Sequence, residues 1–384
     1  MKVIRAQKRT GGDILRWIFS GLDPVLLSVT GMLVVVGLVM VYSSSFVFAK
    51  DTLHDGLYFL KRQAVFAAGG IVLLLALARV PYQAWNRLAW PAAVLSYASL
   101  LAVLIPGVGV SAGGAQRWLA LPGLTFEPSE FAKLAIVIFL AHSLSAKGER
   151  IRDFKQGYLP HLLVTGAFVA VLMRQPDLGT CITIGLVTLI MLFVAGVRWY
   201  HLAATIGCAL PLLVVAVFCA SYRLRRVCAF LSPWDDPLGN GFQIIHSFLA
   251  FGSGGVLGQG AGAGLQKLWY LPQSHTDFIF SVLAEELGLV GVVFVVALFL
   301  TLIVRGIMLS ARASNAGDTF GSYLALGLTL MVGLQALINI CVVMGLLPTK
   351  GLTLPFISYG GTSLALNLVA VGMLLNVAAQ TRRA

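Results

Sequence analysis

Charged side chains are scarce in this chain. Asp, Glu, Lys and Arg make up only 11% of its 384 residues, whereas hydrophobic residues make up 58%. Soluble domains usually contain about 25% charged residues, so this chain could not cover a water-exposed surface. The same composition excludes a disordered chain, a coiled coil and a collagen helix. It therefore predicts a membrane protein that crosses the bilayer several times.

Cysteine and the common cofactor motifs are also scarce or absent. The five cysteines form no CxxC pair, which argues against a disulfide framework and against a zinc site. The chain contains no GxxxxGKS phosphate loop, no HExxH and no DxD. Glycine-rich stretches alone are weak evidence for a nucleotide, so no nucleotide cofactor is expected.

Acidic residues are the scarcer charge, with 15 against 27 basic residues and a net charge of +12. In a soluble protein such an excess would suggest nucleic-acid binding. No basic module interleaved with aromatic residues is present, so no nucleic-acid partner is expected. The basic residues are instead expected in cytoplasmic loops, where they contact anionic lipid head groups.

The hydrophobic runs predict ten transmembrane helices, because a helix needs about 20 apolar residues to cross a bilayer. They are expected at about Pro24–Phe48, Gln63–Ala78, Leu88–Pro106, Phe131–Ser145, Tyr158–Met173, Leu178–Val197, Tyr200–Ser221, Phe278–Val304, Phe320–Met344 and Ser363–Ala379. The predicted fold class is an all-α polytopic membrane protein.

The basic residues also predict the orientation of these helices. With the N-terminus in the cytoplasm, the inside segments contain sixteen basic residues and the short outside loops contain six, as the positive-inside rule requires. Both termini are then cytoplasmic. Residues 1–23 form one tail, residues 24–380 a single transmembrane domain, and residues 381–384 a second tail. Residues 222–276 form a large periplasmic loop between the seventh and eighth helices.

Four outer segments differ from ordinary connectors. They are rich in glycine, proline, aromatic residues and isolated charges, and they comprise Ser111–Glu130, Arg174–Asp177, Tyr222–Thr276 and Leu346–Thr362. Irregular backbone at a membrane is tolerated only where protein covers it or where it lines a wet cavity. A functional site is therefore expected on the outer face.

The strongest candidate for a catalytic residue is Asp277. It ends the motif WYLPQSHTD (Trp269–Asp277) and lies at the predicted start of the eighth helix. An Asp in this place can serve as a helix N-cap, which is the structural alternative. A carboxylate at the mouth of an apolar cavity can instead act as a general base, because burial raises its pKa toward neutrality. His275, two residues earlier, is a candidate substrate-binding residue.

Two further candidate substrate-binding pairs lie near the start of the fourth helix. In EPSEFAK, Glu130 and Lys133 are three residues apart and share a helical face. They form either an internal ion pair or a site in which Lys133 faces an anionic ligand. In GGAQRWL, Arg117 can bind a phosphate through two hydrogen bonds. Trp118 suits either a sugar face or the membrane interface.

Two isolated cations complete the candidate substrate-binding set. Arg174 lies in the outer turn RQPD, where the alternative is a local pair with Asp177. Lys350 lies in PTKGLTLPFISYGGTS, which also suits a simple turn before the last helix.

The order of these motifs resembles that of the SEDS family (shape, elongation, division and sporulation proteins). The resemblance is carried by YSSS, GAQRWL, PSEFAK, RQPDLGT, GNGFQ, LPQSHTDFIFSVLAEELG and PFISYGGTS, which together span almost the whole chain. The segments Lys267–Gly288 and Leu347–Gly361 look more like the division branch of the family than like the elongation branch.

The resemblance implies a peptidoglycan glycosyltransferase that polymerises lipid II into β-1,4 glycan strands. It places the enzyme in the inner membrane at the division septum, with its site on the periplasmic side. Asp277 would be the essential carboxylate, and Arg117, Trp118, Glu130 and Lys133 match family positions in or near the cavity.

The resemblance also implies partners: a class B penicillin-binding protein (an FtsI-type transpeptidase) and other division proteins. It allows for a divalent cation (Mg²⁺ or Mn²⁺) as cofactor. Two other functions stay open from the sequence. One is a lipid II flippase or another transporter of lipid carriers, and the other is a noncatalytic scaffold for division proteins.

Overall fold

The computed structural model describes residues 21–112, 115–121, 124–267 and 274–381. The predictions for most of the N-terminal tail, for residues 269–273 of the WYLPQSHTD motif and for residues 382–384 lie outside the described residues.

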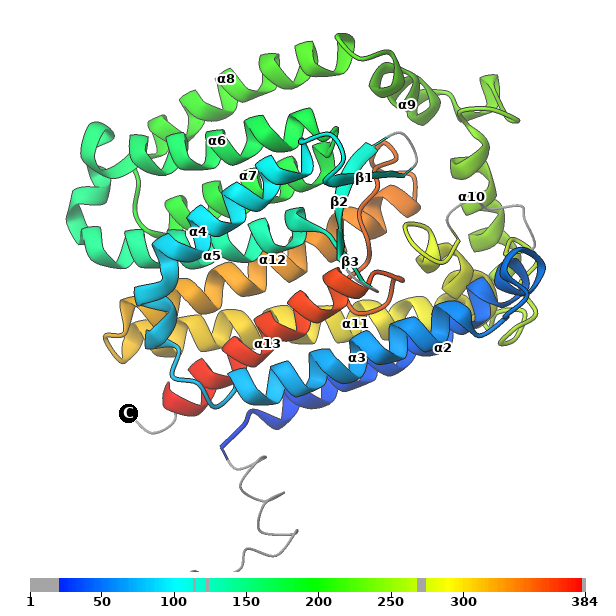
Figure 1. Ribbon diagram of the computed structural model, residues 1–384, viewed down its shortest axis with the longest axis horizontal. Helices are drawn as coiled ribbons and strands as arrows, with labels where there is room; N and C mark the ends of the chain where they lie inside the picture. The colour runs from blue at the N-terminus through cyan, green and yellow to red at the C-terminus, as the bar shows by residue number, and fades with distance from the viewer. Residues whose placement is uncertain (1–20, 113–114, 122–123, 268–273, 382–384) are drawn as a thin grey trace, which may run out of the picture.

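Within the described ranges, ten helices of 16 residues or more form a bundle and run roughly along its long axis (Figure 1). They are α2 (Pro24–Leu53), α3 (Tyr58–Leu77), α4 (Gln83–Val103), α5 (Pro128–Lys147), α6 (Leu159–Arg174), α7 (Leu178–Val194), α8 (Trp199–Phe218), α11 (Ile279–Asn315), α12 (Thr319–Val343) and α13 (Gly361–Thr381). Two short helical turns, η1 (Gly148–Arg152) and η2 (Phe154–Tyr158), join α5 to α6. The ten helices follow the predicted hydrophobic segments in order, and their centres agree. Individual ends differ, and α11 continues to Asn315, beyond the predicted end at Val304.

Eight helices in the described part of the chain are long and apolar enough to cross a membrane, judged by length and composition. Of the other two, α7 is shorter, with 17 residues, and α4 does not meet the same criteria. The helical, multi-pass class is therefore confirmed, whereas the count of ten crossings and their orientation stay predictions.

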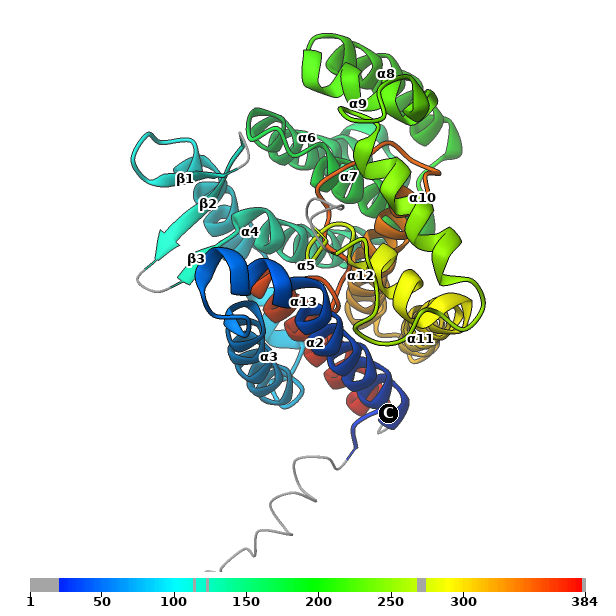
Figure 2. The same ribbon diagram turned by 90° about the vertical axis from the view of Figure 1, so that its right-hand side faces the viewer.

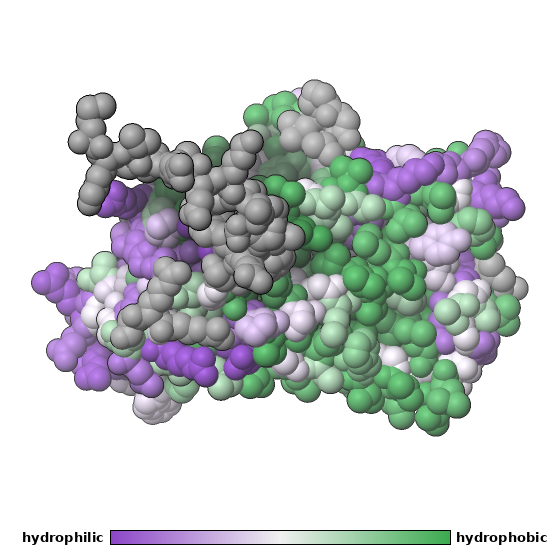
Figure 3. Space-filling view, turned by 90° about the horizontal axis from the view of Figure 1, so that it is seen from below, coloured by the Kyte–Doolittle hydropathy of each residue, from purple (hydrophilic) through white to green (hydrophobic). Residues whose placement is uncertain are grey.

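The molecular surface supports the membrane assignment. In Figure 3, hydrophilic residues gather toward both ends of the long axis, and a largely hydrophobic band lies between them. Large apolar side chains such as Val35, Val72 and Leu212 are exposed. Apolar patches of this extent are not stable in water, but lipid chains solvate them.

Side-chain caps fix where some of the helices begin. Asp23 Oδ1 accepts hydrogen bonds from the backbone N–H groups of Val25 (3.0 Å) and Leu26 (3.1 Å) at the start of α2. Asp177 accepts from Thr180 N at 3.2 Å at the start of α7. These caps satisfy N–H groups that have no partner inside the helix.

Close packing joins α3 to α13. A Cβ atom on Gly372 of α13 would lie 2.7 Å from the carbonyl oxygen of Leu74, so only glycine allows the two backbones to touch here. By contrast, α8 lies at the edge of the bundle (Figure 1). Leu202 is its only buried residue.

A three-stranded antiparallel sheet, absent from the all-α prediction, connects α4 to α5. Its strands β1 (Gly109–Ala112), β2 (Ala115–Leu121) and β3 (Leu124–Phe126) pair in the order β1-β2-β3. The strands are short and lie within an outer segment predicted as irregular, so their alternation is too brief to stand out. β2 carries Arg117 and Trp118, and it lies at the end of the bundle opposite to the C-terminal end of α13 (Figure 1).

The predicted loop 222–276 is partly helical. It contains α9 (Ser221–Leu231), the short turn η3 (Pro233–Asp235) and α10 (Phe242–Gly254). These elements lie at the same end of the bundle as the sheet (Figures 1 and 2). The outer segments singled out in the sequence therefore gather at one end.

Candidate functional site

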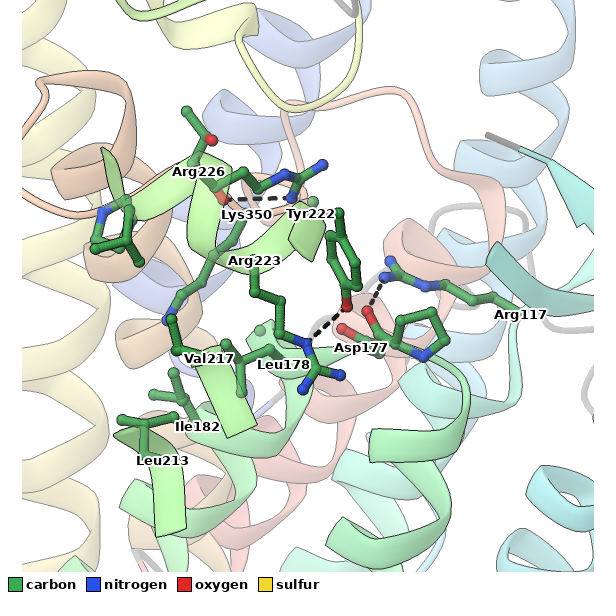
Figure 4. A pocket seen from close by; sticks show the side chains of 16 residues that line it. Arg117, Asp177, Leu178, Ile182, Leu213, Val217, Tyr222, Arg223, Arg226 and Lys350 are labelled. Atoms are coloured by element: carbon green, nitrogen blue, oxygen red, sulfur yellow. Dashed lines mark hydrogen bonds between the residues drawn. The ribbon is translucent and has the colours of Figure 1, made fainter. Parts of the chain in front are cut away.

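A cavity of about 210 Å³ opens at this end of the bundle (Figure 4). Five parts of the chain form it: β2, the start of α7 with the turn before it, the end of α8, α9, and the segment before α13. The lining residues are Arg117, Pro176, Asp177, Leu178, Gly179, Ile182, Leu213, Val217, Tyr222, Arg223, Arg226, Val227, Pro348, Thr349, Lys350 and Gly351.

Four cationic side chains line this cavity, Arg117, Arg223, Arg226 and Lys350, against the single carboxylate of Asp177. Within the described ranges, none of the four forms an ion pair shorter than 4 Å. Burial lowers the pKa of Lys350, because an ammonium group is less stable away from water. The three guanidinium groups stay protonated and still outnumber the carboxylate of Asp177, so the positive charge of the cavity suits an anion.

Backbone carbonyl groups hold two of these guanidinium groups in place. Arg117 donates to the carbonyl oxygens of Gln175 (3.2 Å) and Pro176 (2.5 Å), and Arg226 donates to that of Thr349 (3.3 Å). A neutral carbonyl orients a guanidinium group without cancelling its charge. The remaining N–H groups can therefore still bind phosphate oxygens.

Sequence reasoning did not identify Arg223 and Arg226 as site residues. Figure 4 shows both of them on α9, together with Tyr222, around the cavity. The signal was present in SYRLRRVCAFL, since residues three apart in a helix share one face. The prediction of a loop over residues 222–276 hides this face, because it assigns no helix to the segment.

Asp277 lies beside the cavity, next to Gly351 of its lining. A Cβ atom on Gly351 would lie 3.4 Å from Asp277 Oδ2 and 3.6 Å from Arg117 Nη1. The carboxylate and the guanidinium group therefore flank the same point. Burial raises the pKa of Asp277 to about 6, while the positive charges of Arg117 and Arg226 limit the rise. Such a carboxyl group can accept a proton near neutral pH.

Other segments hold the backbone around Asp277. Asn339 of α12 donates to the Asp277 carbonyl oxygen at 3.0 Å, and Ser358 Oγ donates to the Thr276 carbonyl oxygen at 2.6 Å. The N-cap of α11 is Phe278 and not Asp277. Asp277 therefore does not have the helix-capping role that was its structural alternative.

His275 is packed among aromatic rings and does not line the cavity. Its ring lies 4.7 Å from that of Phe59, 5.7 Å from that of Phe48 and 6.0 Å from that of Tyr359, centroid to centroid. Burial lowers the pKa of His275 to about 4, so the ring is neutral at pH 7. Its geometry is that of a packing residue beside Asp277.

Glu130 and Lys133 form the internal ion pair that was one of their two predicted alternatives. Lys133 Nζ lies 2.8 Å from Glu130 Oε1 and donates to Gln335 Oε1 at 2.5 Å. Both residues are buried, with 2% of Lys133 and 7% of Glu130 exposed. The hydrogen bond to Gln335 joins α5 to α12, and neither Glu130 nor Lys133 lines this cavity.

Trp118 and Arg174 also lie away from the cavity lining. Trp118 is half-buried in β2 opposite Val110. Arg174 is exposed at the end of α6. Among the ion pairs between described residues, none joins Arg174 to Asp177, whose carboxylate caps α7 instead.

Glu127, at the start of α5, is a titratable group that sequence reasoning did not select. Burial, and next the negative charge of Glu130, raise its pKa to about 8. Its Oε1 accepts a hydrogen bond from Ser129 Oγ at 3.1 Å. Arg117 and Asp177 also act on its charge, so Glu127 belongs to the same electrostatic environment as the cavity.

The described residues contain no group of three or more His, Cys, Asp or Glu side chains placed to hold a metal ion. The carboxylates of Glu127, Asp177 and Asp277 do not form such a group. The residues described here therefore do not fit a divalent-cation site built by the protein alone.

The fold and the site define a polytopic membrane protein with a cationic cavity and a carboxylate of raised pKa at one end of a helical bundle. The chain belongs to the cell cycle protein family of FtsW, RodA and SpoVE, whose model matches residues 24–383. The predicted SEDS resemblance is thus confirmed.

Individual relatives match along nearly the whole chain. A protein of Geobacter sulfurreducens named "Probable peptidoglycan glycosyltransferase FtsW" is 47% identical over 362 residues, which cover 94% of this chain and 96% of the relative. Stage V sporulation protein E of Bacillus subtilis is 43% identical over 360 residues, covering 94% and 98%.

Solved structures show the same fold. One, described as "Structural coordination of polymerization and crosslinking by a peptidoglycan synthase complex", aligns with a TM-score of 0.78 at 32% identity and covers 95% of this chain and all of the other. The rod shape determining protein RodA of Thermus thermophilus aligns with a TM-score of 0.68 at 28% identity and covers 94% and 97%.

Proposed function

We propose that this protein is a peptidoglycan glycosyltransferase that polymerises lipid II, with Asp277 as the general base. The observation that carries the proposal is the position of Asp277 and Arg117 on either side of one point next to a cationic cavity. The names of the relatives support the same activity.

The lining of the cavity suits a diphosphate attached to a lipid. Arg117, Arg223, Arg226 and Lys350 supply positive charge, and arginine binds phosphate oxygens through paired hydrogen bonds. Apolar residues of α7 and α8 form the adjoining wall, namely Ile182, Leu213 and Val217. A polyprenyl chain could pass along this wall while its diphosphate stays at the cations.

The chemistry requires one base. The acceptor is the 4-hydroxyl group of a GlcNAc unit, and Asp277 removes its proton as the oxygen attacks the anomeric carbon of the donor strand. The bond from that carbon to the lipid diphosphate breaks, with inversion, and a β-1,4 linkage forms. The departing diphosphate is a weak base, so it needs charge neutralisation more than a proton.

The cations of the cavity lining, and not Lys133, are suited to stabilise this leaving group, because Lys133 is already paired with Glu130. A divalent cation would arrive with the diphosphate. Substrate phosphates often hold Mg²⁺ together with only a few protein ligands.

We place the site at the outer face of the inner membrane, at the division septum, with a class B penicillin-binding protein as partner. The excess of basic residues in the predicted inside segments supports this orientation. The similarity to a peptidoglycan synthase complex supports a partner that crosslinks glycan strands.

Reconstitution of the Asp277→Asn variant with lipid II and the transpeptidase tests the proposal. Glycan products on a gel should fall by about 10²-fold or more, the usual contribution of a general base. Asp235→Asn, an exposed aspartate after α9, is the matched control and should polymerise like the wild type. Full-length glycan from Asp277→Asn would refute the base. Translocation of labelled lipid II without polymerisation would instead support a flippase.

A further inference from the structure

Helix α11 is broken nine residues after its start. Gly288 has a non-helical backbone (φ 62°, ψ −163°), and the break leaves helix N–H and C=O groups without their usual partners. The loop after α10 binds them. Leu289 N donates to the Gly255 carbonyl oxygen at 2.9 Å, and Gly260 N donates to that of Glu286 at 3.0 Å. The glycine-rich loop thus replaces the missing turn of the helix.

Two carboxylates of α11 also bind this loop. Glu285 Oε1 accepts from Leu265 N at 2.8 Å, and Glu286 Oε2 accepts from Gly262 N at 3.0 Å. Both glutamates are only 1% exposed. A Cβ atom on Gly264 would lie 2.8 Å from a Glu285 oxygen, so the loop is pressed closely onto these carboxylates.

A buried lysine completes the cluster. Lys267 Nζ lies 2.7 Å from Glu286 Oε1 and donates to Ser43 Oγ at 2.9 Å and to the Gly262 carbonyl oxygen at 2.8 Å. Ser43 of α2 in turn donates to Glu286. Removing one charge of such a pair leaves the other buried and unpaired, which is strongly unfavourable.

Asp277 is connected to this cluster through the first half of α11. In the sequence, Lys267 precedes Asp277 by ten residues. Downstream, the short half of α11, residues 279–287, leads from Asp277 to the break at Gly288. The cluster therefore anchors the half-helix that follows the proposed base.

We propose that Lys267 and Glu286, with Ser43, are positioning residues that hold Asp277 in its reactive place. This inference rests on the proposed function. Neither side chain lines the cavity, so they act through the backbone that they clamp. A displacement of about 1 Å of a catalytic group can cost about 10²-fold in rate.

The test compares Glu286→Gln and Lys267→Met with Asp277→Asn in the reconstituted polymerisation assay. We expect kcat to fall by about 10²-fold in Glu286→Gln and in Lys267→Met, which we call the clamp variants, while KM for lipid II changes by less than about threefold. KM should hold because the cavity lining is intact. The midpoint of the pH–rate profile should also move to lower pH, since a loosened segment admits water to Asp277. The other charged groups around Asp277 stay in place, namely Arg117, Arg226, Asp177 and Lys350.

Controls separate positioning from general stability. Arg305→Met removes a different ion pair, with Asp23 at 3.2 Å, and should keep wild-type kcat. Lys267→Arg preserves the charge and should restore most of the rate. If Glu286→Gln does not fold, Ser43→Ala leaves the ion pair intact and should lower kcat in the same direction by a smaller factor.

Two results would overturn the inference. In the first, all clamp variants keep the wild-type kcat and pH profile while Asp277→Asn is inactive. This result would refute the positioning role and leave the proposed function intact. The other is an equal loss of kcat in Arg305→Met. An active Asp277→Asn variant would instead refute the proposed function itself.

Discussion

The substitution Gly351→Ala probes the point between Asp277 and Arg117 without touching either side chain. The added methyl carbon would lie 3.4 Å from Asp277 Oδ2 and 3.6 Å from Arg117 Nη1, which are ordinary van der Waals distances. The protein can therefore accept the methyl group. Replacement of glycine by alanine where the backbone tolerates it usually stabilises a protein by about 0.4–1 kcal/mol, so the thermal midpoint should not fall.

Catalysis should respond differently. A base must come within about 2.6–3.2 Å of the oxygen whose proton it removes, and the methyl group would occupy this side of Asp277. The acceptor hydroxyl would have to move by roughly 1 Å, and such misplacement can cost about 10²-fold. We therefore expect kcat of Gly351→Ala to fall by about 10²-fold.

Gly360→Ala provides the matched control. It lies in the same segment, and its new methyl carbon would have a similar clearance, 3.5 Å from Thr353 and 3.6 Å from Ser363. The assay is the rate of glycan formation from lipid II by both variants, with thermal unfolding in parallel. Wild-type turnover in Gly351→Ala would show that the reaction does not use the point between Asp277 and Arg117.

Three further predictions follow from the site. Turnover should fall about tenfold per pH unit below about 6, because Asp277 must be ionised to act as a base; a flat profile between pH 5 and 7 would contradict this. Burial raises the pKa of Asp277 from 3.8 to about 6. Above pH 6 the buried carboxylate is ionised and lowers the stability of the fold, and this destabilisation disappears as the pH falls toward 4. Asp277→Asn should thus raise the thermal midpoint at pH 7 but not at pH 4. Lys133→Met should lower the free energy of unfolding by about 3–5 kcal/mol, because it leaves Glu130 buried without its partner. Adding Glu130→Gln to this variant should recover part of the lost stability. If the losses of the two single variants simply add in chemical denaturation, the two residues do not stabilise each other.

The helical framework was predictable because each crossing must bury its backbone polar groups in its own hydrogen bonds, which requires long apolar runs. The runs that became α2, α11 and α12 are unmistakable for this reason. The sheet was not predictable, because β1 and β3 have only four and three residues. Their pairing depends on contacts that the sequence pattern does not display.

The candidate site was predictable only in part. Asp277, Arg117 and Lys350 meet at one end of the bundle, and each belongs to a motif that the sequence makes visible. Lys133 was harder to interpret, because an i, i+3 pair can face a ligand or itself. Its partner Gln335 lies about two hundred residues away in the chain, and only the packed structure brings it close.

The position of α8 at the edge of the bundle has a consequence for measurements of turnover. With Leu202 as its only buried residue, this helix is held less by the protein interior than by the hydrocarbon around it. The tilt of a membrane helix depends on the thickness of the hydrocarbon layer around it. Variants should therefore be compared in liposomes of one fixed acyl-chain length. A change in rate then reflects the mutated residue and not a change in the tilt of α8.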